Sequence, residues 1–156
     1  MKGMENQNKT YTLRHIRTSI FNFTEGLSLK QINEIPAGFN NNIIWNLGHL
    51  VATDQRILYV RSSLPSAVSN EFIGKYQKGT KPETFIEEEE VSEIKRLLLW
   101  SVDQLEEDYN KKIFVNYEEW ITPYGNTIST FEEALAFLPF HEGLHRGAIM
   151  ALKRHL

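Results

Sequence analysis

The sequence predicts an all-α fold, a four-helix bundle with a long crossover between the second and third helices and a short irregular hairpin before the fourth. Four segments repeat apolar residues at the spacing of an α-helix. A fifth segment, 61–86, is irregular and long enough to connect two helices across the bundle. The length of 156 residues fits a single helical domain, 1–156. Together these observations favour helices that pack on one another around one core.

Composition and charge exclude several classes of function. The chain has no cysteine, so disulfides, iron–sulfur clusters and thiolate zinc sites are ruled out. Its net charge of -3, without a basic stripe, argues against nucleic-acid binding. No apolar run approaches the roughly 20 residues of a membrane span, and the first residues lack the apolar region of a signal peptide. We therefore expect a cytoplasmic protein that binds neither nucleic acid nor membrane.

The first two helices are expected at residues 8–25 and 41–60. In the first, Leu13, Ile16 and Ile20 recur at helical spacing, and Gly26 is a typical stop. Asparagines at positions 40–42 are good N-caps for the second. The second helix is strongly apolar and carries His49 near its centre.

The remaining chain divides into a crossover, a third helix, a hairpin and a fourth helix. Two prolines and two glycines between residues 61 and 85 predict an irregular loop. The acidic run 87–90 opens a third helix that lasts to about Tyr109, because acids favour a helix N-terminus. Residues 110–129 contain the turn TPYGNT and suit a short hairpin or crossover. Thr130 and Glu133 form a capping box that starts the fourth helix. Pro139 lies inside that helix and marks either a kink that opens the bundle or a tolerated bend.

Three histidines are candidate metal ligands. His141 and His145 are four residues apart on the apolar face of the fourth helix, so their imidazoles lie one above the other. His49 lies in the middle of the second helix, which bundle packing brings close to the fourth. A three-histidine site between facing helices is therefore geometrically reasonable, since bundle cores commonly hold metals. The alternative is three hydrogen-bonded core histidines without a metal.

Four side chains are candidates for the substrate pocket, and one neighbouring acid is not. Asn46 and Thr53 lie one helical turn from His49, Trp45 suits a pocket wall, and Tyr124 lies in the turn before the fourth helix. Glu142 follows a histidine directly and so points about 100° away from it. We expect Glu142 to be solvated or in an interface, with no obvious general base at the site.

Several motifs together resemble one known family. WNLGHL around His49, EFIGKYQKGTKP at 71–82, TPYG at 122–125 and HEGLHRG at 141–147 are similar to the DinB/YfiT-like superfamily of metalloenzymes. The similarity runs from about Ile43 to Ile149. It implies a four-helix bundle with a long crossover, usually a homodimer. It also implies a metal triad of one histidine on the second helix and an HxxxH pair on the last, which here are His49, His141 and His145.

The resemblance also implies chemistry on a small-molecule substrate. Relatives include bacillithiol S-transferases, mycothiol-dependent isomerases and proteins described as metal-dependent hydrolases, and the fold does not choose among them. Three imidazoles leave coordination positions open, as in catalytic metal sites. Zn or Ni is the expected divalent metal, with Fe, Co, Cu and Mn as alternatives. Thiol S-transfer is our preferred reaction, and the alternatives are a metal-dependent hydrolase and a non-catalytic, metal-stapled, stress-related binding dimer.

Overall fold

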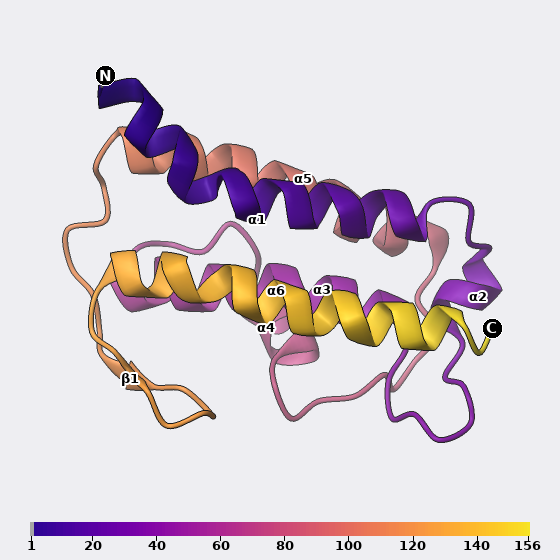
Figure 1. Cartoon of the computed structure of the whole chain (residues 1–156). Coiled ribbons are helices and arrows are strands. Elements are labelled where there is room, and N and C mark those ends of the chain that lie inside the picture. Colours follow the sequence, from indigo (N-terminus) through magenta and orange to yellow (C-terminus); the bar gives the residue numbers. More distant parts are fainter. Residues whose placement is uncertain (1) are drawn as a thin grey trace.

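Four long helices form the molecule. The structure is a computed structural model, which describes residues 2–156 and the side chains of residues 9–156. Helices α1 and α3 both pack against α5 and α6 (Figure 1), and the buried apolar side chains form two clusters among them. The all-α bundle predicted from the sequence is confirmed. None of the helices in the described range has the length and hydropathy needed to cross a membrane. The long helices are α1 (Lys2–Thr24), α3 (Ile43–Asp54), α5 (Glu88–Asn110) and α6 (Phe131–Lys153).

The long crossover follows from the directions of the helices. Helices α1 and α6 run one way, and α3 and α5 run the other way (Figure 1). Because α3 and α5 are parallel, the chain must return along the bundle between them. The prediction of an irregular loop is wrong in one respect, because the segment contains helix α4 (Asn70–Tyr76). This short helix is stabilised by the side chain of Ser69, which accepts from the Phe72 N–H, and by burial of Ile73 and Tyr76.

Local sequence signals set most helix ends. Gly26, with φ of 76°, follows the end of α1 as expected. A short helix that was not predicted, α2 (Leu29–Asn33), begins with a capping box of Ser28 and Gln31. The predicted capping box of Thr130 and Glu133 is present at the start of α6. Helix α6 continues through Pro139 to Lys153, so this proline does not end it.

Two irregular features lie at one end of the bundle. Helix α3 continues into a π-helical turn (Gln55–Tyr59) and a 3-10 turn (Val60–Ser62). The wider π turn rotates the following side chains relative to an α-helix, and such turns are frequent at functional sites. The predicted hairpin is present as β1 (Trp120–Ile121) and β2 (Thr127–Ile128), paired antiparallel.

A buried arginine joins all four long helices. Arg17, on α1, is 0% exposed. Its guanidinium donates to both carboxylate oxygens of Glu142 on α6 and to Asp54 Oδ2 on α3, the latter at 2.7 Å. It also donates to two groups on α5, at 3.1 Å each, and to a carbonyl on α3, at 3.2 Å. These last acceptors are the carbonyl oxygen of Leu98, the hydroxyl of Ser101 and the carbonyl oxygen of Leu50.

The buried ion pairs correct the expectation for Glu142. Its side chain is fully buried, and not solvated or in an interface. Helix α6 contacts both α1 and α3, so a side chain 100° from the histidine face also points into the protein. A carboxylate is tolerated there because Arg17 neutralises it. The second carboxyl, Asp54, has its pKa raised to about 7 by burial, which outweighs the attraction of Arg17.

We predict that Arg17→Met lowers the free energy of unfolding by about 3–5 kcal/mol, because it leaves the carboxyl groups of Asp54 and Glu142 buried without a cation. Urea denaturation measures the change. The matched control is Arg96→Met, which removes an exposed pair with Glu93 and should leave the urea midpoint unchanged.

A second variant tests whether Arg17→Met is destabilising because it leaves unpaired charges or because it removes packing contacts. The triple variant Arg17→Met/Asp54→Asn/Glu142→Gln removes the ionisable groups together and should be more stable than Arg17→Met alone. A triple variant that is equally or more unstable would show that the unpaired carboxylates are not the main cost.

Gly48 allows the ring of Tyr76 to lie directly on α3. A Cβ atom at position 48 would lie 2.6 Å from Cδ1 and 2.7 Å from Cε1 of Tyr76. The ring has little room to move, since it is 2% exposed and its hydroxyl donates to Glu90 Oε1 at 2.7 Å. This close approach fixes α4 against α3.

Gly48→Ala should therefore destabilise the protein by about 1–3 kcal/mol, the usual cost of overpacking a core. The control is Gly147→Ala on α6, where no atom lies within 4 Å of the added Cβ. That substitution should gain up to about 1 kcal/mol from helix propensity. Urea unfolding of both variants is the measurement, and equal stabilities would contradict the close contact.

Candidate metal centre

The backbone of α4 fixes the orientation of His49. Its Nδ1 lies 2.7 Å from the carbonyl oxygen of Tyr76. A carbonyl can only accept, so Nδ1 carries the proton and donates it. Tyr76 is the last residue of α4, where carbonyl groups lack a partner within the helix. The bond therefore gives the Tyr76 carbonyl a partner and leaves a lone pair on His49 Nε2.

A side chain on α3 orients His145 in the same way. Its Nδ1 lies 2.8 Å from Asn46 Oδ1. The Asn46 amide cannot be reversed, because its Nδ2 donates to the carbonyl oxygen of Asn42 at 2.8 Å. His145 Nδ1 is therefore the donor, and Nε2 is left with a free lone pair. Such an acceptor on the outer nitrogen is typical of histidines that bind metals.

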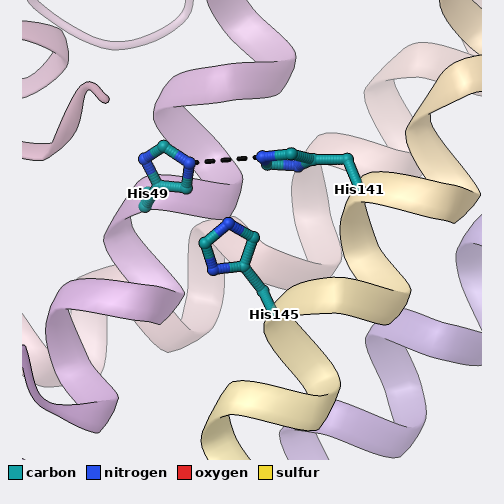
Figure 2. Close-up of side chains that lie close together, drawn as sticks. All are labelled: His49, His141 and His145. Atoms are coloured by element: carbon teal, nitrogen blue, oxygen red, sulfur yellow. Dashed lines mark hydrogen bonds between the residues drawn. The ribbon is translucent and has the colours of Figure 1, made fainter. Parts of the chain in front are cut away.

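His141 completes a cluster between α3 and α6. Its Nε2 lies 3.2 Å from Nε2 of His49, and its ring centre lies 4.6 Å from that of His145. Figure 2 shows the three rings directed at a common point, His49 from α3 and the other two from α6. The Nδ1 of His141 is buried and has no hydrogen-bond partner among the described residues.

The three imidazoles are neutral at physiological pH. Burial lowers the pKa of His49. Burial also lowers the pKa of His141 to about 2, with further contributions from the other two histidines, and that of His145 to about 3. Metal binding requires deprotonated imidazole, so all three side chains are in the binding form.

The geometry of the cluster fits one divalent metal. The three ligand nitrogens lie within 4.8 Å of one another. Two imidazoles on one zinc ion, each at about 2.0–2.1 Å, would have nitrogens about 3.0–3.4 Å apart, and the observed 3.2 Å falls in this range. Without a cation, the lone pairs on Nε2 of His49 and His145 converge, and the donors beside them are one His141 proton and the Thr53 hydroxyl. The cluster therefore suits a metal better than a set of core histidines.

A cleft of about 790 Å³ opens onto the three histidines. Trp45, Thr53 and Tyr124, three of the predicted pocket residues, line it. Trp45 stacks on His49 with ring centres 4.8 Å apart, and the Thr53 hydroxyl lies 3.3 Å from His49 Nε2. The fourth, Asn46, holds His145 by the bond described above and is not part of the cleft wall.

The cleft also contains residues that the sequence did not single out. Arg56 and Arg61 come from the irregular end of α3, Trp120 from β1 and Phe137 from α6. Arg56 is seven residues after His49, a helical spacing that would have pointed to it. Trp120 belongs to the hairpin, and no local sequence pattern predicts that this hairpin lies against the cleft of the histidines.

Comparison with known proteins identifies the family of this chain. No curated protein and no solved structure matches the chain significantly. A family model described as the DinB superfamily matches residues 12–149, a range that contains all three histidines. The match covers most of the 156 residues, and the chain therefore belongs to the DinB superfamily.

Proposed function

We propose that this protein is a metal-dependent enzyme acting on a small molecule, with one divalent transition metal held by His49, His141 and His145. The observation that carries the proposal is the convergence of three neutral imidazoles, two of them oriented by hydrogen bonds at Nδ1, on one wall of an open cleft. Membership in the DinB superfamily supports the same assignment. Zn and Ni are the first candidates, because nitrogen ligands suit both.

An open cleft supports a catalytic role over a purely structural one. Structural zinc sites are usually closed by four protein ligands, whereas catalytic sites have three ligands and an open position. Within residues 9–156, the metal-ligand group contains the three histidines and no carboxylate. The cleft volume of about 790 Å³ lies in the range of small-molecule pockets.

Thiol transfer to an electrophile is the reaction that the cleft supports best. A divalent metal bound there would supply the positive charge that ionises a thiol or a water molecule. No Asp or Glu of the described chain lines the cleft, so no side-chain carboxylate is at hand as a general base. A thiol, with a pKa near 8.5, needs less help to ionise than water, at about 15.7. Trp45 and Tyr124 would hold the substrate from the sides, and Thr53 would donate to its reacting atom.

We predict one equivalent of Zn or Ni per chain after chelator treatment, reloading and gel filtration, measured by mass spectrometry of metals. His145→Ala should lose this metal, since two imidazoles remain. Asn46→Ala should weaken binding by about 10–100-fold, because it removes the acceptor that orients His145. His15→Ala, which removes an exposed histidine on α1, is the control and should bind as the unchanged protein does.

Catalysis is tested with the metal-loaded protein, a panel of low-molecular-weight thiols and the electrophile chlorodinitrobenzene. We expect metal-dependent formation of the thioether, in which sulfur bonds to the ring carbon, chloride leaves and the thiol proton passes to solvent. His145→Ala should abolish this rate above background, and His15→Ala should retain it.

Other outcomes of this test would contradict thiol transfer. Turnover of an ester or amide panel without thioether formation would assign hydrolysis. Metal binding that raises thermal stability without any turnover would assign a structural metal. No stoichiometric metal in the protein with all histidines intact would overturn the proposed function.

A further inference from the structure

The wall of the cleft is positively charged. Three of its residues, Arg56, Arg61 and Lys78, are cations, and none is an acid. The chain as a whole has more acids than bases, 20 Asp and Glu against 17 Lys and Arg. The charge of the cleft is therefore opposite in sign to that of the molecule. Positive charge concentrated in a cleft favours an anionic ligand.

Arg56 is the cation best placed to bind a ligand at the histidines. It is half-buried, and none of the ion pairs formed among residues 9–156 involves it. It lies in the π-helical turn that continues α3 and lines the same cleft as His49 and Thr53 of that helix. At a rise of up to about 1.5 Å per residue, its Cα lies about 10 Å or less beyond that of His49 along the helix axis, and helical side chains lean back toward the N-terminus. A small molecule can span that distance.

The other two cations have different surroundings. The Arg61 guanidinium lies 5.2 Å from the ring centre of Trp120 and donates to the carbonyl oxygens of Glu118 and Glu119, at 3.3 and 3.4 Å. Arg61 therefore holds the segment that leads into β1 through Nη1, while its buried Nε has no hydrogen-bond partner among the described residues. Lys78, which follows α4, is exposed. Lys78 therefore lacks the burial of Arg56, and Arg61 is already engaged with the backbone through its Nη1 atom.

Aromatic rings form much of the rest of the wall. Trp45 is stacked on His49, and Trp120 meets Phe137 edge to face with ring centres 5.8 Å apart. These surfaces suit a planar or apolar group. The cleft thus combines a guanidinium at one side with aromatic surfaces around the histidines.

We propose that the substrate of this cleft carries an anionic group, a carboxylate or a phosphate, which pairs with the Arg56 guanidinium while a planar or apolar part lies against the aromatic wall over the histidines. The inference rests on the proposed function for the chemistry at the histidines. Binding of the anion itself depends on Arg56 and not on a metal. Arg56 is thus a specificity-determining residue, which selects anionic over neutral substrates.

The test uses three probes of similar shape: benzoate, phenyl phosphate and the neutral benzamide. Isothermal titration calorimetry near pH 7.5 measures their binding to the full-length protein, both chelator-treated and metal-loaded. In the chelator-treated protein we expect at least one anion to bind about tenfold or more tightly than benzamide, as a charge-assisted pair should. The ratio of benzoate to phenyl phosphate affinity distinguishes the two anion chemistries.

Variants assign the preference to Arg56. Arg56→Gln should bind anionic and neutral probes with equal affinity, whereas Arg56→Lys keeps the charge and should retain most of the preference. The matched control is Arg154→Gln, which removes an exposed cation at the end of α6, outside the cleft wall, and should behave like the unchanged protein. Equal affinities in the unchanged protein, or a preference that survives in Arg56→Gln, would overturn the proposal.

The two proposals fail in different ways. Loss of the anion preference leaves metal binding and thiol transfer untouched. A protein that shows the Arg56-dependent preference when metal-free, but no metal-dependent turnover when loaded, would contradict the proposed function and leave this inference standing.

Discussion

The guanidinium of Arg17 is the contact on which the arrangement of the bundle depends. It is the one side chain in the described structure that bonds to all of α3, α5 and α6 from α1. Its partner Glu142 follows His141 directly in the chain, so the ion pair also fixes the rotation of α6 about its axis. A helix rotated or shifted by one residue would separate the carboxylate from Arg17. The ion pair of Arg17 and Glu142 thus keeps the histidine face of α6 turned toward α3.

Two of the three histidines, His49 and His145, are in turn fixed from outside the cluster. His49 is held by the end of α4, and His145 is held by Asn46. Both bonds place the proton on Nδ1 and leave Nε2 for a ligand, so the tautomers are set before any metal binds. This preorganisation lowers the cost of assembling three imidazoles around one ion. It explains why a small bundle without cysteine can offer a metal site in its core.

The sequence predicted the features that depend on local pattern. The four long helices, the capping box at Thr130 and the inward position of His141 and His145 all follow from the spacing of residues along one segment. The DinB family was also predicted from motifs and is confirmed. The short helix α4 was missed because prolines and glycines dominate its surroundings, although Ser69 offered an N-cap. The expected homodimer and cytoplasmic location stay predictions.

Features that join distant segments could not be predicted in the same way. Arg17 and Glu142 are 125 positions apart, and the sequence analysis predicted only Glu142, as a solvated or interface residue. The only local signal was an arginine between Leu13 and Ile20, on the apolar side of the first helix. The carbonyl of Tyr76 left no signal, because every residue has one. Pairing of buried charges and backbone acceptors depends on the packed fold and not on local periodicity.

The bond from His49 to the end of α4 makes the crossover part of the metal site. Local opening of α4 would take away the acceptor of His49 Nδ1 and free the ring to turn. A metal that holds the ring in place must, by thermodynamic linkage, oppose that opening to the same extent. The segment that reconnects the two parallel helices should therefore open less readily when the three histidines hold a metal. Its resistance to hydrogen exchange and to proteases would report whether the histidines hold an ion, without any assay of chemistry.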